Sequence, residues 1–269
     1  MRIGSRDFEV GKHTYVMGIL NVTPDSFSDG GKYDVLSSAI EHASQMVIDG
    51  VDIIDVGGES TRPGYTMISE EEEMERVVPV IKAIKERWDV PVSIDTYKAK
   101  VARAAVEAGA DMINDIWGLC YDGEMAGVVK ETGVPVCIMH NRKEAVYTNY
   151  MEDVFKDIGE SLKIAKEAGI SPDRIILDPG IGFAKNYEQN LIMLKNLEEL
   201  KQFGYPLLLA ASRKSVIGLA TNLPADEREE GTIVTSVLAA QAGYFMVRVH
   251  DVKKNARAIK MMEAIRDAK

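Results

Sequence analysis

The sequence is poor in the residues that define disulfide, metal and membrane proteins. Its two cysteines, Cys120 and Cys137, are too few for a disulfide framework and too far apart for a Cys-x-x-Cys site, so two buried, reduced thiols are expected. Its four histidines lack the spacings typical of zinc ligands, which disfavours a zinc site. No apolar run is long enough to span a membrane and no hydrophobic signal segment is visible, so a cytoplasmic protein is expected.

Basic residues are fewer than acidic residues. The chain carries 32 Lys and Arg against 42 Asp and Glu, a net charge of −10, which disfavours nucleic acids and anionic membrane surfaces as partners. Hydrophobic residues make up 46% of the chain and charged residues 28%, as in ordinary globular proteins with a large core. No linker or shift in composition divides the 269 residues, so a single domain over residues 1–269 is expected.

The chain repeats one unit: a short apolar run, a polar loop and an amphipathic helix. Residues 1–13 come first and are expected to form a short hairpin or plug. The expected strands span residues 15–20, 52–56, 92–95, 112–114, 135–139, 174–178, 206–210 and 244–247. The expected helices span residues 36–49, 98–108, 123–132, 153–168, 188–203, 231–242 and 252–266, with one more that begins at Ser69. Eight such units in a chain of this length predict an α/β fold, a (β/α)8 TIM barrel.

A doubly wound open sheet is the alternative architecture. It would need a glycine-rich phosphate fingerprint after the first strand, where the sequence reads Asn-Val-Thr-Pro-Asp at 21–25. The expected strands are continuous apolar runs, as in a parallel sheet covered on both faces. We therefore favour the barrel.

Polar side chains recur where the expected strands end, although the strand interiors are apolar. In a barrel these ends converge on one mouth, where the active sites of this fold lie. A single such residue could cap a loop, but a polar group at each strand end predicts a binding site. The residues are Asn21, Thr61, Arg62, Asp95, Asn114, His140, Asp178, Lys214, Arg248 and His250.

Three of these residues suit a flat heterocycle. Asp95 and Asp178 can accept paired N–H donors, and Asn114 supplies both a donor and an acceptor, which matches an amino-pyrimidinone edge. Alternatively, Asp95 caps the helix that follows and Asp178 caps the turn before Pro179. For the set we favour a ligand, and we interpret His140 as structural.

The ends of the last two strands carry cations. Lys214 follows the seventh strand, and Arg248 and His250 follow the eighth, where barrels often bind phosphate beside a helix N-terminus. Arg248 could instead pair with Asp251. Because Mg²⁺ usually keeps water and substrate phosphates as ligands, Asn21 is a candidate for a single protein ligand.

Seven ordered motifs, spread over the whole chain, resemble those of the dihydropteroate synthases, enzymes of folate biosynthesis. Each lies at an expected strand end, and together they are far more specific than any one alone. The motifs are GILNVTPDSFSDGG at 18–31, GGESTRPG at 57–64, SIDT at 93–96, IND at 113–115, DPGIGF at 178–183, SRKS at 212–215 and RVHD at 248–251.

The resemblance implies a transferase that joins 6-hydroxymethyl-7,8-dihydropterin diphosphate to 4-aminobenzoate, forming 7,8-dihydropteroate and diphosphate. It implies that Mg²⁺ assists the departure of diphosphate and that the arylamine attacks the pterin methylene carbon. The implied partners are these two small molecules and a second copy of the chain, in a homodimer formed through the last helices.

The resemblance also implies roles for individual residues, with Asn21 as the Mg²⁺ ligand. The residues implied in catalysis are Asp95, Asp178, Lys214, Arg248 and His250. The residues implied in binding pterin diphosphate are Thr61, Asp95, Asn114, Asp178, Lys214, Arg248, Val249 and His250. The residues implied on the aminobenzoate side and its loops are Asp25, Phe27, Thr61, Arg62, Phe183 and Ser215.

Two other functions stay open at this point. A related pterin-binding barrel methyltransferase would share the fold and the pterin pocket, but it should lack the full first loop and the SRKS and RVHD motifs. A non-catalytic binding subunit would share the fold too. The presence of Asn21, Asp95, Lys214, Arg248 and His250 disfavours that alternative.

Overall fold

A computed structural model gives the structure of residues 1–23, 32–59 and 67–269. Eight parallel strands form one sheet in the order β8-β7-β6-β5-β4-β3-β10-β9. A further parallel bridge between Leu177 and Leu207 joins the two outer strands of that order, so the sheet closes into a ring. The strands are β3 (Tyr15–Asn21), β4 (Ile53–Gly57), β5 (Val92–Asp95), β6 (Met112–Asp115), β7 (Val136–Met139), β8 (Ile175–Asp178), β9 (Leu208–Leu209) and β10 (Met246–Val249).

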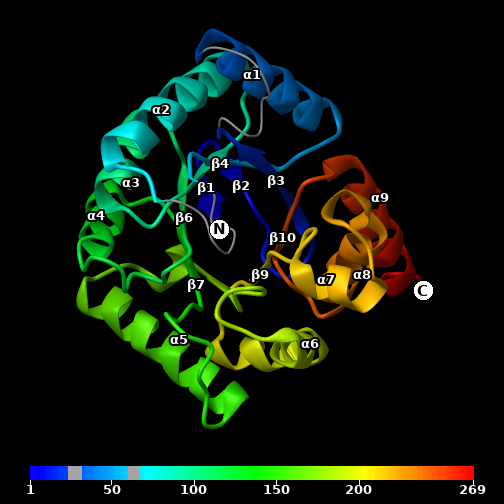
Figure 1. Cartoon of the computed structure of the whole chain (residues 1–269). Helices are drawn as coiled ribbons and strands as arrows, with labels where there is room; N and C mark the ends of the chain where they lie inside the picture. The colour runs from blue at the N-terminus through cyan, green and yellow to red at the C-terminus, as the bar shows by residue number, and fades with distance from the viewer. Residues whose placement is uncertain (24–31, 60–66) are drawn as a thin grey trace.

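Helices surround the ring of strands (Figure 1). They are α1 (Lys32–Ile48), α2 (Glu70–Arg87), α3 (Ala99–Glu107), α4 (Met125–Thr132), α5 (Tyr150–Glu167), α6 (Tyr187–Lys195), α7 (Ser215–Thr221), α8 (Glu229–Gln241) and α9 (Val252–Arg266). Short 3-10 helices lie at η2 (Pro172–Arg174), η3 (Leu197–Phe203) and η4 (Ala225–Glu227). The predicted (β/α)8 barrel is confirmed.

The structure differs from the expected elements most clearly at three places. The eighth strand, expected over 244–247 with Arg248 after it, is β10, which spans Met246–Val249 and includes Arg248. The helix expected over 188–203 is divided into α6 and the 3-10 helix η3. Helix α7 was not expected, because its seven residues are too few to show a clear helical period, and it ends at Asn222 in the left-handed region with φ 58°. The start of α2 is as expected, since the Ser69 hydroxyl accepts the backbone N–H of Glu72 at 3.1 Å.

Two apolar layers form the core. The larger lies between the strands and the helices, and the smaller fills the barrel interior. The interior layer includes Ile3 and Phe8, which β1 (Arg2–Ile3) and β2 (Arg6–Asp7) carry into the barrel as an antiparallel hairpin. The chain therefore begins near the centre of the ring (Figure 1), and the expected hairpin or plug is confirmed.

The cysteine expectation is half right. Cys137 is buried on β7, but Cys120 is exposed, because it lies in the turn after β6 and not within an element. Both are free thiols. Within the ranges that the structure describes, no helix is both long enough and apolar enough to cross a membrane.

Removing the Phe8 ring tests the hairpin as part of the core. Phe8 packs edge-on against Tyr15 and Phe245, so Phe8→Ala should lower the free energy of unfolding by about 3 kcal/mol. The matched control is Val10→Ala, because Val10 is exposed and its truncation should change stability by less than about 0.5 kcal/mol. Urea denaturation measures both. A loss below about 1 kcal/mol for Phe8→Ala would show that the hairpin contributes little to the interior core.

Candidate active site

Three predicted mouth residues, Asp95, Asn114 and Asp178, lie at the carboxyl ends of β5, β6 and β8, and all three are buried. Asp95 is paired in register with Asn114 on one side and with Gly57, at the end of β4, on the other. Parallel strands in this register hold their end residues at one level. The structure therefore brings Asp95 and Asn114 together at the barrel mouth.

Arg248, on β10, reaches across the mouth to two buried carboxylates. Its Nε donates to Oδ2 of Asp55 at 2.5 Å and its Nη2 donates to Oδ2 of Asp95 at 2.6 Å. Asn114 Nδ2 donates to the same oxygen of Asp55 at 3.1 Å. Arg248 therefore pairs with these two carboxylates and not with Asp251, and Asp95 binds Arg248 instead of capping the next helix.

Two oxygens of this cluster, Oδ1 of Asp55 and Oδ1 of Asp95, are buried without a hydrogen bond among the described residues. Burial raises the pKa of Asp95, and the positive charge of Arg248 opposes that rise. Burial alone would lower the pKa of Arg248, but the charges of Asp95 and Asp55 hold it above its ordinary value. Buried acceptors without donors are rare in proteins. These two oxygens are therefore candidates to accept hydrogen bonds from a ligand.

Lys214 approaches the mouth from the loop between β9 and α7. Its Nζ donates to the carbonyl oxygen of Ile181 at 2.5 Å and lies 4.7 Å from the ring centroid of Phe183. Burial lowers the pKa of Lys214 to about 8, against the attraction of Asp178. Burial also raises the pKa of Asp178, whose Oδ1 accepts the backbone N–H of Gly180 at 2.7 Å. One oxygen of Asp178 thus caps the turn, as the alternative expectation had it.

His250 follows β10 and contacts the loop that carries Lys214. Its Nδ1 lies 2.9 Å from the Ser212 hydroxyl, which also accepts the backbone N–H of His250 at 3.2 Å. The start of α9 beside it is capped by Asp251, whose Oδ1 accepts the N–H of Lys254 at 3.0 Å. A carboxylate already occupies this helix start, so any anion at this end of the mouth depends on side chains.

Asn21 ends β3 and is partly exposed. A Cβ on Gly57 would lie 3.6 Å from Oδ1 of Asn21 and 3.6 Å from Oδ2 of Asp95, so the absent side chain keeps this space open. Among the described residues, no group of three or more His, Cys, Asp or Glu could hold a metal ion. The amide oxygen of Asn21 is an oxygen ligand of the kind that Mg²⁺ accepts.

Some predicted site residues do not converge on the mouth. The Val249 side chain packs in the layer between strands and helices, so only its backbone can face a ligand. Ser215 is the exposed first residue of α7. Four further predicted residues lie outside the described part of the chain: Asp25, Phe27, Thr61 and Arg62.

Sequence reasoning missed two sets of buried charges. Asp55 sits inside β4, where an acidic residue in an apolar strand was the available signal. Lys98 Nζ donates to Oε2 of Glu59 and to Oε2 of Glu73, each at 2.7 Å, and Tyr97 donates to Oε1 of Glu59 at 2.6 Å. Glu73 follows three consecutive glutamates at 70–72, a pattern typical of a solvated helix start, so this pairing could not be predicted from the sequence.

A family model described as a pterin binding enzyme matches residues 17–250, the range that carries the mouth residues from Asn21 to His250. The fold and the site thus define a pterin-binding barrel.

Comparison with individual proteins shows which kind of pterin-binding barrel this chain resembles. The chain is 59% identical over 266 residues to the dihydropteroate synthase of Clostridium beijerinckii, covering 98% of this chain and 99% of that one. A crystal structure of the Clostridium difficile dihydropteroate synthase in the presence of pteroic acid superposes with a TM-score of 0.94 at 51% identity, covering 96% and 99% of the two chains. The structure of the Xanthomonas albilineans dihydropteroate synthase with 4-aminobenzoic acid superposes with a TM-score of 0.93 at 39% identity, covering 96% of this chain and 95% of that one. The chain belongs to the dihydropteroate synthase family.

Truncating Asp55 tests the buried charge cluster. Asp55→Ala leaves the guanidinium of Arg248 with one carboxylate partner instead of two, so the free energy of unfolding should fall by about 3 kcal/mol. Asp7→Ala is the matched control, because it removes an exposed ion pair with Arg2 and should cost less than about 1 kcal/mol. Urea denaturation compares the two variants. Similar small losses for both would contradict an energetic role for the cluster.

Proposed function

We propose that the barrel mouth condenses 6-hydroxymethyl-7,8-dihydropterin diphosphate with 4-aminobenzoate to form 7,8-dihydropteroate and diphosphate. As a member of the dihydropteroate synthase family, the chain is a transferase of folate biosynthesis. The amine nitrogen bonds to the pterin methylene carbon, the bond from that carbon to the diphosphate oxygen breaks, and one amine proton is released. The observation that carries the proposal is the buried cluster of Asp55, Asp95, Asn114 and Arg248, which concentrates donors and acceptors at one level of the mouth.

The proposed pterin pocket consists of Asp95, Asn114, Asp178 and Lys214, with the backbone of Val249 beside them. The carboxylates would accept N–H donors of the pterin ring, and Asn114 would present both a donor and an acceptor. Their negative charge also favours the cationic character that develops on the methylene carbon as diphosphate leaves. The unused oxygen of Asp95 supports this assignment.

The proposed diphosphate site consists of Asn21, Arg248 and His250. Arg248 remains 14% exposed at the mouth while it binds the two carboxylates, so a ligand can reach it. We propose that Asn21 holds Mg²⁺ together with the diphosphate oxygens. When bound there, the ion would neutralise charge on the leaving diphosphate.

The remaining residues are proposed to serve the aminobenzoate. Phe183 and Ser215 would line its side of the pocket, with Thr61 and Arg62 on the second loop and Asp25 and Phe27 on the first. An arylamine is neutral and nucleophilic at pH 7, so the chain need not supply a strong base. The contribution of the protein is to orient the amine and to keep water from the electrophilic carbon.

We further propose that the chain forms a homodimer through α8 and α9. Val234 and Leu238 lie one turn apart on α8, and Met261 and Ile265 lie one turn apart on α9. All four are exposed, and the two helices pack against each other, so the four side chains can form one apolar surface. We also propose a cytoplasmic location, as expected for a chain with too few cysteines for a disulfide framework.

A turnover assay tests the proposed reaction. The purified protein, given dihydropterin diphosphate, 4-aminobenzoate and Mg²⁺, should release diphosphate and form dihydropteroate in equal amounts. Chelation of Mg²⁺ should abolish both products, because the leaving charge then lacks its counterion. A reaction without aminobenzoate controls for hydrolysis. Failure to form dihydropteroate under these conditions would remove the assignment.

Lys214→Ala tests the pterin pocket. Loss of a charged hydrogen-bond donor should weaken the binding of dihydropterin diphosphate by about 2 kcal/mol, or roughly 30-fold in the dissociation constant. Lys195→Ala is the control, since Lys195 is exposed on α6 and should leave binding unchanged. Isothermal titration calorimetry measures both dissociation constants. Equal affinities in the two variants would mean that Lys214 lies outside the pocket.

A further inference from the structure

The loop after β8, residues 179–186, turns tightly against the end of β7. Gly180, Gly182 and Ala184 have positive φ values of 70°, 83° and 43°. A Cβ on Gly180 would lie 2.0 Å from the carbonyl oxygen of His140, so the backbone can pass here only without a side chain. The course of this loop decides where Phe183, at its centre, is held.

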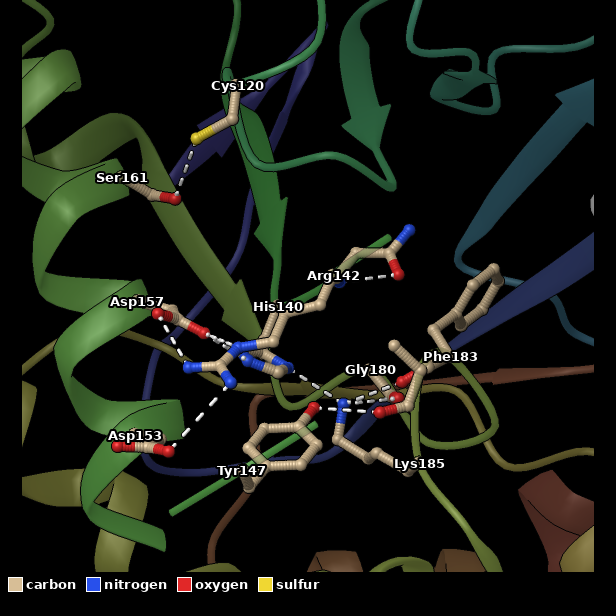
Figure 2. A network of polar contacts seen from close by, with 12 residues as sticks. Cys120, His140, Arg142, Tyr147, Asp153, Asp157, Ser161, Gly180, Phe183 and Lys185 are labelled. Carbon is tan, nitrogen blue, oxygen red and sulfur yellow. Dashed lines mark hydrogen bonds and ion pairs between the residues drawn. The ribbon is translucent and has the colours of Figure 1, made fainter. Parts of the chain in front are cut away.

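Lys185 binds one side of this loop (Figure 2). Its Nζ donates to the carbonyl oxygens of Gly180 at 2.9 Å and Phe183 at 3.1 Å, and it lies 2.8 Å from Nδ1 of His140. Burial lowers the pKa of Lys185 to about 7. In its charged form the ammonium group has three N–H donors, so these three acceptors occupy all of them. Lys185 therefore has no donor left for a substrate.

His140 connects Lys185 to α5. Burial lowers the pKa of His140 to about 4, so its imidazole is neutral at pH 7, and its Nε2 lies 3.1 Å from Oδ2 of Asp157. A neutral ring that donates through Nε2 leaves the Nδ1 lone pair to accept from Lys185. Arg142 fixes Asp157 in turn, with Nε–Oδ2 and Nη2–Oδ1 distances of 2.5 and 3.1 Å.

Lys214 binds the same loop from the segment between β9 and α7. Its Nζ donates to the carbonyl oxygen of Ile181, between the two carbonyls that Lys185 binds, and lies over the Phe183 ring. Two lysines thus bind three carbonyls of a single turn. The position of Lys185 sets where Ile181 and Phe183 stand relative to Lys214.

We propose that Lys185 is a positioning residue for substrate binding, which acts through the 179–186 loop and does not touch the substrate. The inference rests on the proposed function, because that assigns Lys214 and Phe183 to the substrate pocket. Without the ammonium group, the carbonyls of Gly180 and Phe183 lose a shared donor, and the substrate itself has to order the loop. Ordering a loop on binding reduces affinity.

Lys185→Met tests the role directly, because it keeps an unbranched side chain and removes the three donors. The dissociation constant of dihydropterin diphosphate with Mg²⁺, measured by calorimetry, should rise about 10- to 100-fold. The KM for 4-aminobenzoate should rise as well, since Phe183 is no longer held. Lys143→Met, on the neighbouring exposed loop, is the matched control and should leave both values unchanged.

His140→Phe provides an independent test, because it keeps a buried ring and removes the acceptor of Lys185. It should weaken pterin binding in the same direction. Since both residues act through one contact, the double variant should bind no more weakly than Lys185→Met alone, whereas independent effects would add. Additive losses would overturn the proposal. If Lys185→Met does not fold, unchanged pterin binding in His140→Phe overturns it.

Melting temperatures separate positioning from simple stabilisation. A Lys185→Met protein that melts earlier, yet binds pterin diphosphate like the wild type where both are folded, would overturn the proposal. Because calorimetry measures pterin diphosphate binding directly, the role of Lys185 can be tested independently of the proposed reaction. A wild-type protein that binds pterin diphosphate but forms no dihydropteroate would overturn the proposed reaction, while the comparison of variants would still decide the role of Lys185.

Discussion

The barrel mouth depends on the largely buried guanidinium of Arg248. Arg248 lies on β10 and binds Asp55 on β4 and Asp95 on β5. Strand β10 pairs with β3, so the last strand of the chain lies beside the first strand of the barrel. Buried charges persist only when they are paired and hydrogen-bonded, so the three side chains fix one another. Asn114 joins them through Asp55. This cluster ties β4, β5, β6 and β10 together at the mouth of the barrel.

The fold could be predicted because its signal is local and repeated. Most strands are short, largely apolar segments, and the long helices show a helical period, so the count of units decides the barrel. The two-residue strand β9 and the helix α7 were the weak points. Their limits depend on contacts with distant segments, such as the bridge from Leu207 to Leu177, which no local pattern reveals.

The site could be predicted in part for a related reason. Parallel strands end at one edge, so Asp95 and Asn114 had to come close whatever their partners. The carboxylate partner of Arg248 could not be predicted in this way, because β10 and β4 are far apart in the chain. The sequence predicted an anion site at Arg248, with its near neighbour Asp251 as the alternative partner, and did not point to Asp55. The placing of Lys185 against His140 depends in the same way on the path of a loop with three left-handed residues.

Asp55 and Asp95 each have one buried oxygen that lacks a hydrogen bond among the described residues. These two oxygens affect how stable the protein is in a cell. Each unsatisfied buried acceptor lowers stability by roughly 1–3 kcal/mol. A ligand that donates to them does so only in the native state, so its concentration enters the folding equilibrium by mass action. A cell short of this ligand would hold a larger unfolded fraction, which proteases remove. A ligand that binds these oxygens would thereby link its own supply to the abundance of the protein without any regulator.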